Sequence, residues 1–314
     1  MATSNCSSAA VFLLLGFSEL PGLQLLLFLL FFSLYALALL GNVGMILVIC
    51  TSPRLRTPMY FFLLNLSLLD ICYSSDISPQ MLVHLLAEEK SISFSGCAAQ
   101  MYIFVLLGTS EALLLAVMAY DRFVAICSPL RYMLTMTSGL CARLVSAAFG
   151  VGAVQSLVQT SLTFQLPFCH SNKINHFFCD VPPLLKASSA DVHLNELVLF
   201  LLASLTTVTS ILIILVSYIY IISAILKMRP TTGRQRTFST CSSHLTVVCL
   251  FYGTIFFMYF RPPSTSFRGK DQVVSVVYTA VIPALNPLIY SLRNKKVMEA
   301  LRTALAWKTL PVKR

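Results

Sequence analysis

Residues 197–226 read LVLFLLASLTTVTSILIILVSYIYIISAIL, without a single charge between Glu196 and Lys227. A helix needs about 20 mostly apolar residues to cross about 30 Å of hydrocarbon, so this stretch is long enough to span a membrane. Lipid-exposed chains cross the bilayer only as helices or closed barrels, because these satisfy their backbone hydrogen bonds internally. The stretch therefore predicts a membrane-spanning helix and argues against a water-soluble fold.

The rest of the chain repeats this pattern. Four more charge-free intervals occur, and two further apolar stretches are broken only by Asp70 and Asp76 in one and by Glu111 in the other. Only 11% of the residues are charged, against roughly 25% in soluble domains. We predict an all-α membrane protein that forms one domain over residues 1–314, a seven-transmembrane helix bundle with spans near 23–50, 57–86, 94–127, 139–161, 194–228, 235–260 and 272–292.

The positive residues predict the orientation of these helices. With the N-terminus outside, 16 of the 22 Lys and Arg residues fall on the cytosolic side, as the positive-inside rule requires. We therefore expect a multi-pass plasma-membrane protein with an extracellular N-terminus, residues 1–22, and a cytoplasmic tail, residues 293–314. Asn5 heads a glycosylation pattern on the outer side, Asn5-Cys6-Ser7. The spacing of apolar and charged residues in 294–307 predicts a short amphipathic helix on the membrane surface.

The net charge of +10 raises the question of a nucleic-acid partner. The basic residues stand at helix ends rather than along one solvated face, so anionic membrane lipid is the expected partner and nucleic acid is not.

An acid and an arginine are adjacent in MAYDRFVAIC, residues 118–127, at the predicted cytosolic end of the third helix. These charges either reach headgroup water by snorkelling or form a switch element. Together with PMYFFLLNLS (58–67), FSTCSSHL (238–245) and PALNPLIY (283–290), this motif closely resembles the signatures of odorant (olfactory) receptors, a rhodopsin-like G-protein-coupled receptor family. The resemblance covers nearly the whole chain, and four motifs on four predicted spans make it specific.

The resemblance implies a sensory function and a set of residue roles. A volatile odorant would activate a stimulatory, olfactory-type G protein and raise cyclic AMP, in the cilia of olfactory sensory neurons. Arg122 would leave Asp121 and meet the G protein, while Tyr218 and Tyr290 line the opened cytosolic cleft. The prolines of the seventh helix would either weaken it for this rearrangement or form static kinks.

The resemblance also assigns cysteines. Cys97 and Cys179 correspond to the family's disulfide. The usual second bridge would join Cys169 to a position where this chain has Ser189. We therefore expect Cys169 to be a free thiol, or else to pair outside the family pattern.

Two acids are predicted at the same depth in the membrane. At about 1.5 Å per residue, Asp70 and Glu111 both lie roughly 15 to 18 Å from the cytosolic ends of their helices. Either they share a proton or bind a cation, with Asn42 and Asn286 completing the cluster, or they form a structural hydrogen-bond network. The resemblance favours a sodium ion, and no other cofactor is expected.

A ligand cavity is predicted where helix faces converge above these acids. The helical spacing indicates an apolar, uncharged site with a few hydroxyls, which suits a small volatile molecule such as an alcohol, ester, ketone or aldehyde. Amine-binding relatives carry an acid about where Phe104 stands, which disfavours a biogenic amine. For any one member, ordinary packing between helices explains the residue equally well. The candidates are Phe104, Val105, Gly108, Thr109, Leu202, Thr206, Tyr252, Ile255, Tyr259, Val276 and Thr279.

Two other classes of membrane protein compete with a receptor. Buried acids and broken helices also occur in ion-coupled transporters and channels, but the odd number of helices and the lack of a repeat disfavour them. An enzyme is not expected, because the sequence has no paired His-Glu metal motif and no nucleophile beside a base.

Overall fold

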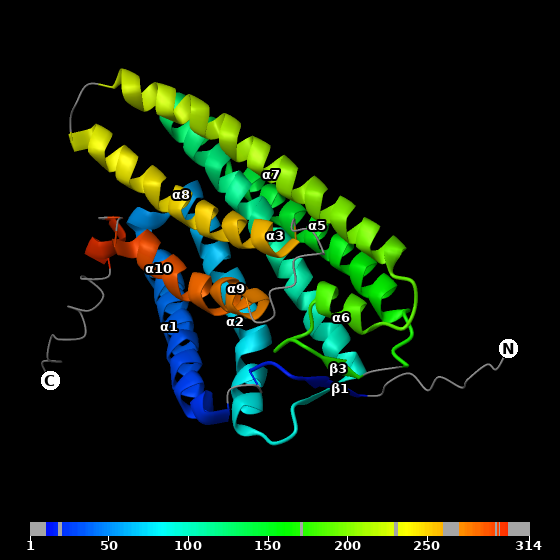
Figure 1. Cartoon of the computed structure of the whole chain (residues 1–314). Coiled ribbons are helices and arrows are strands. Elements are labelled where there is room, and N and C mark those ends of the chain that lie inside the picture. The colour runs from blue at the N-terminus through cyan, green and yellow to red at the C-terminus, as the bar shows by residue number, and fades with distance from the viewer. Residues whose placement is uncertain are drawn as a thin grey trace, which may run out of the picture.

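A computed structural model of the protein describes residues 11–17, 21–169, 172–228, 232–259, 270–292, 294 and 296–300. Most of the described residues form long helices that pack side by side (Figure 1). They are α1 (Gln24–Thr51), α2 (Pro58–Leu86), α3 (Phe94–Cys127), α5 (Ser138–Phe164), α7 (His193–Lys227), α8 (Thr232–Tyr259) and a seventh segment that ends in α10 (Ile282–Leu292). Each predicted span agrees with its helix to within three residues at both ends.

Local sequence explains several helix starts. Pro58 opens α2, where its missing N–H has no helical partner to lose. The hydroxyl oxygen of Ser93 accepts a hydrogen bond from the Gly96 amide at 3.1 Å and caps α3. Thr137 caps α5 in the same way, accepting from the Leu140 amide at 3.3 Å. Such caps satisfy amide groups that the first helical turn leaves without carbonyl partners.

The seventh segment is interrupted where the prolines predict weakness. It consists of α9 (Lys270–Val276), a π-helical turn η3 (Val277–Val281) and α10. The Ile282 amide donates to the Val277 carbonyl, five residues earlier, and the next residue is Pro283, which has no amide hydrogen to donate. The helix therefore widens by one residue just before this proline.

The outer surface of the bundle is apolar. Among the described residues, six helices are long and apolar enough to cross a membrane, and α1 and α7 bury only 17% and 22% of their most apolar windows. On α7, Leu205 is 67% exposed and Ile219 is 62% exposed. The helix α2 is not among these six, and its polar residues Asp70, Ser74 and Ser78 point inward. Hydrocarbon rather than water suits such a surface.

Short elements gather at one end of the bundle (Figure 1). The strand β1 (Val11–Leu14) pairs antiparallel with β2 (Ser91–Ser93) and parallel with β3 (Lys173–Ile174). The helix α6 (Val181–Ala187) follows β3. We call the loop between α5 and α7, which contains β3 and α6, the lid. The strands were not predicted from the sequence.

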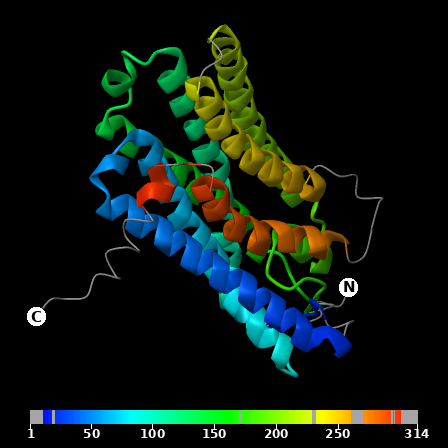
Figure 2. The same ribbon diagram turned by 90° about the vertical axis from the view of Figure 1, so that its left-hand side faces the viewer.

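The other end of the bundle holds the tips of α7 and α8 and the end of α10. Figure 2 shows α1 lying along α10, which their contacts confirm. Two short helices connect long ones, η2 (Pro53–Leu55) between α1 and α2 and α4 (Tyr132–Thr135) between α3 and α5, and η1 (Pro21–Leu23) directly precedes α1. Of the predicted C-terminal helix, residues 296–300 are helical and Val297 is buried, while the remainder lies outside the described residues, as Asn5 does.

Candidate functional site

A disulfide ties the lid to α3. Cys97 and Cys179 are bonded, with their Cα atoms 5.5 Å apart, which confirms this prediction. The Cys179 amide also donates to the side-chain oxygen of Gln100 on α3 at 2.9 Å. The lid is therefore held over the helix ends both covalently and by a buried hydrogen bond.

Of the two alternatives for Cys169, the free thiol is wrong, because Cys169 is disulfide-bonded, and its bond lies outside the family pattern. Ser189 stands where the family pattern has a second cysteine, and its hydroxyl accepts a hydrogen bond from the Cys169 amide at 3.2 Å. The Ser189 amide donates to the Pro167 carbonyl at 3.0 Å. This part of the lid is thus fixed in place without the usual bridge.

Aromatic residues of the lid pack into the bundle. The ring of Phe178 is fully buried, with its centroid 4.9 Å from that of Phe104 on α3 and 6.5 Å from that of Tyr278 in η3. The neighbouring His176 ring is also buried, and its Nε2 lies 3.0 Å from the Ser275 hydroxyl on α9. Burial lowers the pKa of His176 to about 3, so the ring is neutral at physiological pH.

Beneath the lid lies a cavity of about 100 Å³. None of the residues that line it carries a formal charge, and its polar groups are hydroxyls and carboxamides. The lining comes from α2, α3, α5, α6, α7, α8 and η3. It consists of Tyr73, Phe104, Val105, Gly108, Thr109, Ala112, Gln155, Gln159, Val181, Leu199, Ala203, Thr206, Thr207, Phe251, Thr254, Ile255, Met258 and Tyr278.

The structure places six of the predicted ligand-site residues in this lining: Phe104, Val105, Gly108, Thr109, Thr206 and Ile255. Leu202 and Val276 are half-buried outside the lining. The Tyr252 hydroxyl donates to the Ala112 carbonyl at 3.1 Å, and the Thr279 hydroxyl donates to the Ser275 carbonyl at 2.7 Å. Both side chains are therefore engaged outside the lining. The side chain of Tyr259 lies outside the described residues.

Sequence reasoning missed the wall that α5 contributes. Gln155 and Gln159 are one helical turn apart, so they share a face of this helix. Their polarity inside a charge-free span could have indicated that they face the protein interior, because polar side chains that face lipid destabilise a membrane helix.

The acids Asp70 and Glu111 lie in a polar cluster on the side of the cavity away from the lid. Asn286 donates from its Nδ2 to both carboxylate oxygens of Asp70, at 3.1 and 3.0 Å. Asn42 donates to the Pro283 carbonyl at 3.0 Å. Among the described residues, three buried oxygens of this region have no hydrogen-bond donor: Oε1 of Glu111 and Oδ1 of Asn42 and Asn286. The Glu111 oxygen can take a proton, and all three oxygens can coordinate a hard cation.

The Asp121-Arg122 pair makes separate contacts. The Arg122 Nη1 donates to the Thr240 carbonyl on α8 at 2.7 Å, while Asp121 accepts from the Tyr132 hydroxyl on α4 at 2.9 Å. Burial and the neighbouring Asp121 carboxylate raise the pKa of Tyr132, which stays protonated and can donate. The arginine thus joins α3 to α8 rather than to its sequence neighbour.

A buried histidine adds to this link between helices. His244 on α8 has its Nε2 3.1 Å from the Leu115 carbonyl on α3 and its Nδ1 2.9 Å from the Tyr218 hydroxyl on α7. The neutral ring donates from Nε2 to the carbonyl, and its Nδ1 accepts a hydrogen bond from the Tyr218 hydroxyl, which also lies 3.2 Å from the Cys241 carbonyl. We call Arg122, Thr240, His244, Leu115 and Tyr218 the α3–α8 clasp.

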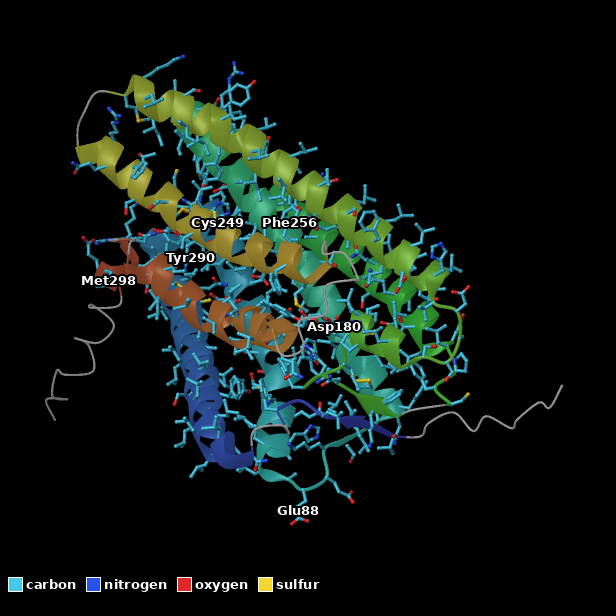
Figure 3. All side chains as sticks on the ribbon, viewed as in Figure 1. Glu88, Asp180, Cys249, Phe256, Tyr290 and Met298 are labelled. Carbon is cyan, nitrogen blue, oxygen red and sulfur yellow. A yellow bond between two sulfur atoms is a disulfide. The ribbon has the colours of Figure 1, made fainter. Side chains whose placement is uncertain are left out.

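The clasp and the lid lie at different ends of the bundle. Figure 3 labels Asp180 in the lid and Tyr290 toward the end of α10. Arg122, Thr240 and Tyr290 line a second, small cavity, and the Tyr290 hydroxyl has no hydrogen-bond partner among the described residues. Tyr290 therefore lies beside the clasp, whereas Tyr218 is part of it.

An apolar helical bundle with a disulfide-tethered lid over an uncharged cavity is the architecture of a helical membrane protein with an internal cavity. The sequence pattern of the family described as olfactory receptor matches residues 31–308. Human olfactory receptor OR9H1 is 54% identical over 301 residues, 96% of this chain and 98% of that protein. Mouse olfactory receptor 9S13 is 56% identical over 295 residues, 94% of this chain and 89% of that protein. The chain belongs to the olfactory receptor family.

Membership in this family settles the class of protein. It is a multi-pass membrane receptor with the family's seven-helix bundle, it is a G-protein-coupled receptor, and it is not an enzyme.

Proposed function

We propose that this receptor binds a small, volatile and mostly apolar odorant in the cavity beneath the lid. The observation that carries the proposal is the absence of charge from the residues that line the cavity, together with its enclosure by seven elements. Small-molecule sites are typically apolar pockets with a few placed polar groups. A charged ligand would lose its hydration without gaining an ionic partner here.

The helix α8 connects the cavity to the clasp. Phe251, Thr254 and Ile255 line the cavity, and Thr240 and His244 of the same helix bond to α3. Thr240 and Phe251 are 11 residues apart, a rise of about 16 Å along a helix. A ligand that binds more tightly when α8 is displaced shifts the receptor toward that conformation, because its affinity for the two positions of α8 differs. Displacement of α8 weakens the clasp.

Release of the clasp would free Arg122 to contact a G protein. In this proposal the partner is a stimulatory, olfactory-type G protein, and the second messenger is cyclic AMP. The lid faces outside the cell with the N-terminus, and the clasp faces the cytosol, where 16 of the 22 Lys and Arg residues would lie. The plasma membrane of olfactory cilia is the proposed location, and Asn5 the proposed glycosylation site.

We propose further that the cluster around Asp70 and Glu111 holds one positive charge, either a proton or a sodium ion. The three buried oxygens without donors support this proposal, since two adjacent acids would otherwise repel each other. The charge would stabilise the arrangement in which Asn286 binds Asp70.

A blocked cavity tests the ligand site. Ala203 on α7 lines the cavity, and Ala203→Phe would fill much of it, whereas Val208→Phe adds a ring to the outward face of the same helix. Cells expressing each receptor are given an odorant panel, with cyclic AMP, membrane current and odorant uptake recorded. We expect active odorants to raise cyclic AMP in the wild type and in Val208→Phe, without current or uptake, and to lose at least tenfold in potency in Ala203→Phe.

Two outcomes would contradict the proposal. Equal potency on Ala203→Phe and Val208→Phe at matched surface expression would place the ligand elsewhere. Current or uptake without cyclic AMP would favour a channel or transporter.

A further inference from the structure

The α5 wall of the cavity contains a carboxamide without a protein partner. Gln159 is only 4% exposed, it lines the cavity, and its side chain makes no hydrogen bond to any residue that the structure describes. Two of the hydroxyls nearby are engaged: the Thr206 hydroxyl donates to Oε1 of Gln155 at 2.8 Å, and the Thr254 hydroxyl donates to the Phe251 carbonyl at 2.7 Å.

A buried amide without partners is unusual and unfavourable. About 90% or more of buried polar groups in proteins are hydrogen-bonded to protein or to ordered water, and a group left without either is destabilising. Gln159 lies within a membrane-spanning helix, where leucine would be favoured by solvation alone. Its carboxamide is therefore available to a hydrogen-bonding group inside the cavity.

The free groups on this wall define the chemistry of the ligand. The amide of Gln159 offers both N–H donors and an acceptor oxygen. Gln155 offers its two N–H donors, while its oxygen already accepts one hydrogen bond from Thr206. A hydroxyl satisfies both kinds of group, since it accepts one hydrogen bond and donates another. A ketone, ester or ether accepts only, and would leave the Gln159 oxygen buried without a donor.

The remaining lining matches an apolar body. Phe104 and Phe251 line the cavity, and Val181 of the lid helix α6 covers it. At about 100 Å³ the cavity resembles in scale the engineered cavity of about 150 Å³ that accommodates benzene. The ligand is therefore small.

We propose that Gln159 determines the specificity of this receptor and that its ligands are small uncharged alcohols, whose hydroxyl binds the Gln159 carboxamide. This inference rests on the proposed odorant site and narrows its ligand class. The hydroxyl donates to Oε1 of Gln159 and accepts from Nε2 of Gln155 or Gln159, while the hydrocarbon part lies against Phe104 and Phe251.

The test compares matched ligands on matched variants. Straight-chain and aromatic primary alcohols are each paired with their methyl ether and their parent hydrocarbon. Gln159→Leu removes the amide at similar volume, and Gln159→Met does so with a more adaptable side chain. Gln165→Leu makes the same change at an exposed position after the end of α5. Binding is read as thermal stabilisation of the purified receptor, and signalling as cyclic AMP in cells.

We expect the wild type and Gln165→Leu to bind at least one alcohol about tenfold more tightly than its ether. In Gln159→Leu and Gln159→Met this preference should shrink to less than about threefold, with the ether unaffected or improved. A tenfold change corresponds to about 1.4 kcal/mol, within the range for one buried hydrogen-bonding group.

The inference is overturned if the ratio of alcohol to ether affinity is the same in Gln159→Leu as in the wild type, or if ethers and hydrocarbons bind the wild type as well as alcohols do. Alcohols that stabilise the purified receptor through Gln159 without raising cyclic AMP would refute the proposed signalling and leave this inference standing.

Discussion

The replacement His244→Phe should raise the activity of the receptor without any odorant. The wild-type ring makes two hydrogen bonds that cross between helices, one to the Leu115 carbonyl at 3.1 Å and one to the Tyr218 hydroxyl at 2.9 Å. Each is expected to contribute about 0.5 to 1.5 kcal/mol, so their loss weakens the α3–α8 clasp by about 1 to 3 kcal/mol. Phenylalanine keeps most of the packing volume and supplies neither bond.

This change in free energy should be visible as basal cyclic AMP. A shift of 1 to 3 kcal/mol multiplies the ratio of active to resting receptor by roughly 5 to 150, until the active form predominates. The assay measures cyclic AMP in cells with equal amounts of receptor at the surface. The control is Thr246→Val on the exposed face of α8, because the Thr246 hydroxyl bonds only within its own helix, to the Ser242 carbonyl at 2.8 Å.

One result would refute the role of the clasp. If His244→Phe and His244→Leu reach the surface, respond to odorant and show the basal cyclic AMP of Thr246→Val, then the bonds of His244 do not restrain α8.

Three further predictions concern the lid and the acid cluster. Cys179→Ser should reduce surface expression and the thermal stability of the purified receptor, because it removes the disulfide that closes a loop with a sequence separation of 82. In the chain-entropy model this disulfide contributes about 4 to 5 kcal/mol to the free energy of unfolding. Unchanged stability would contradict this prediction. His176 has a folded pKa of about 3 against 6.5 when unfolded, so its contribution to stability is present above pH 6.5 and lost as the pH falls toward 3. At pH 5.5 the loss is about 1 kcal/mol, and His176→Phe should show a shallower fall in melting temperature over this range. Asp70→Asn should abolish the dependence of basal cyclic AMP on sodium chloride measured against choline chloride, if the cluster binds sodium; a dependence on pH alone in the wild type would instead indicate a shared proton.

The helices could be predicted from the sequence because a membrane span is a local property. The gap in charge between Glu196 and Lys227 is enough to position α7, and Pro283 is enough to predict weakness in the seventh segment. The three strands could not be predicted, since β1 pairs with residues about 80 and 160 positions away. Such pairing depends on how the chain folds back rather than on local composition.

The site was predictable only in part for a similar reason. Helical spacing indicated that Phe104 and Gly108 share a face, but it did not give the rotation of each helix in the bundle. That rotation brings Gln159 into the cavity and leaves Tyr252 bonded to a carbonyl of α3. The partner of Arg122 is likewise a backbone carbonyl, that of Thr240, and a backbone group leaves no mark in the sequence.

The central claim is that a ligand in the cavity displaces the far end of α8 from α3 and its neighbours. Spin labels at Phe238 of α8, 64% exposed, and Leu134 of α4, 79% exposed, would measure this displacement in the purified receptor by pulsed electron resonance. With an odorant that raises cyclic AMP, the account predicts a longer distance between the labels than in its absence, and no change in Ala203→Phe. A full cyclic AMP response with an unchanged distance between the labels would contradict it.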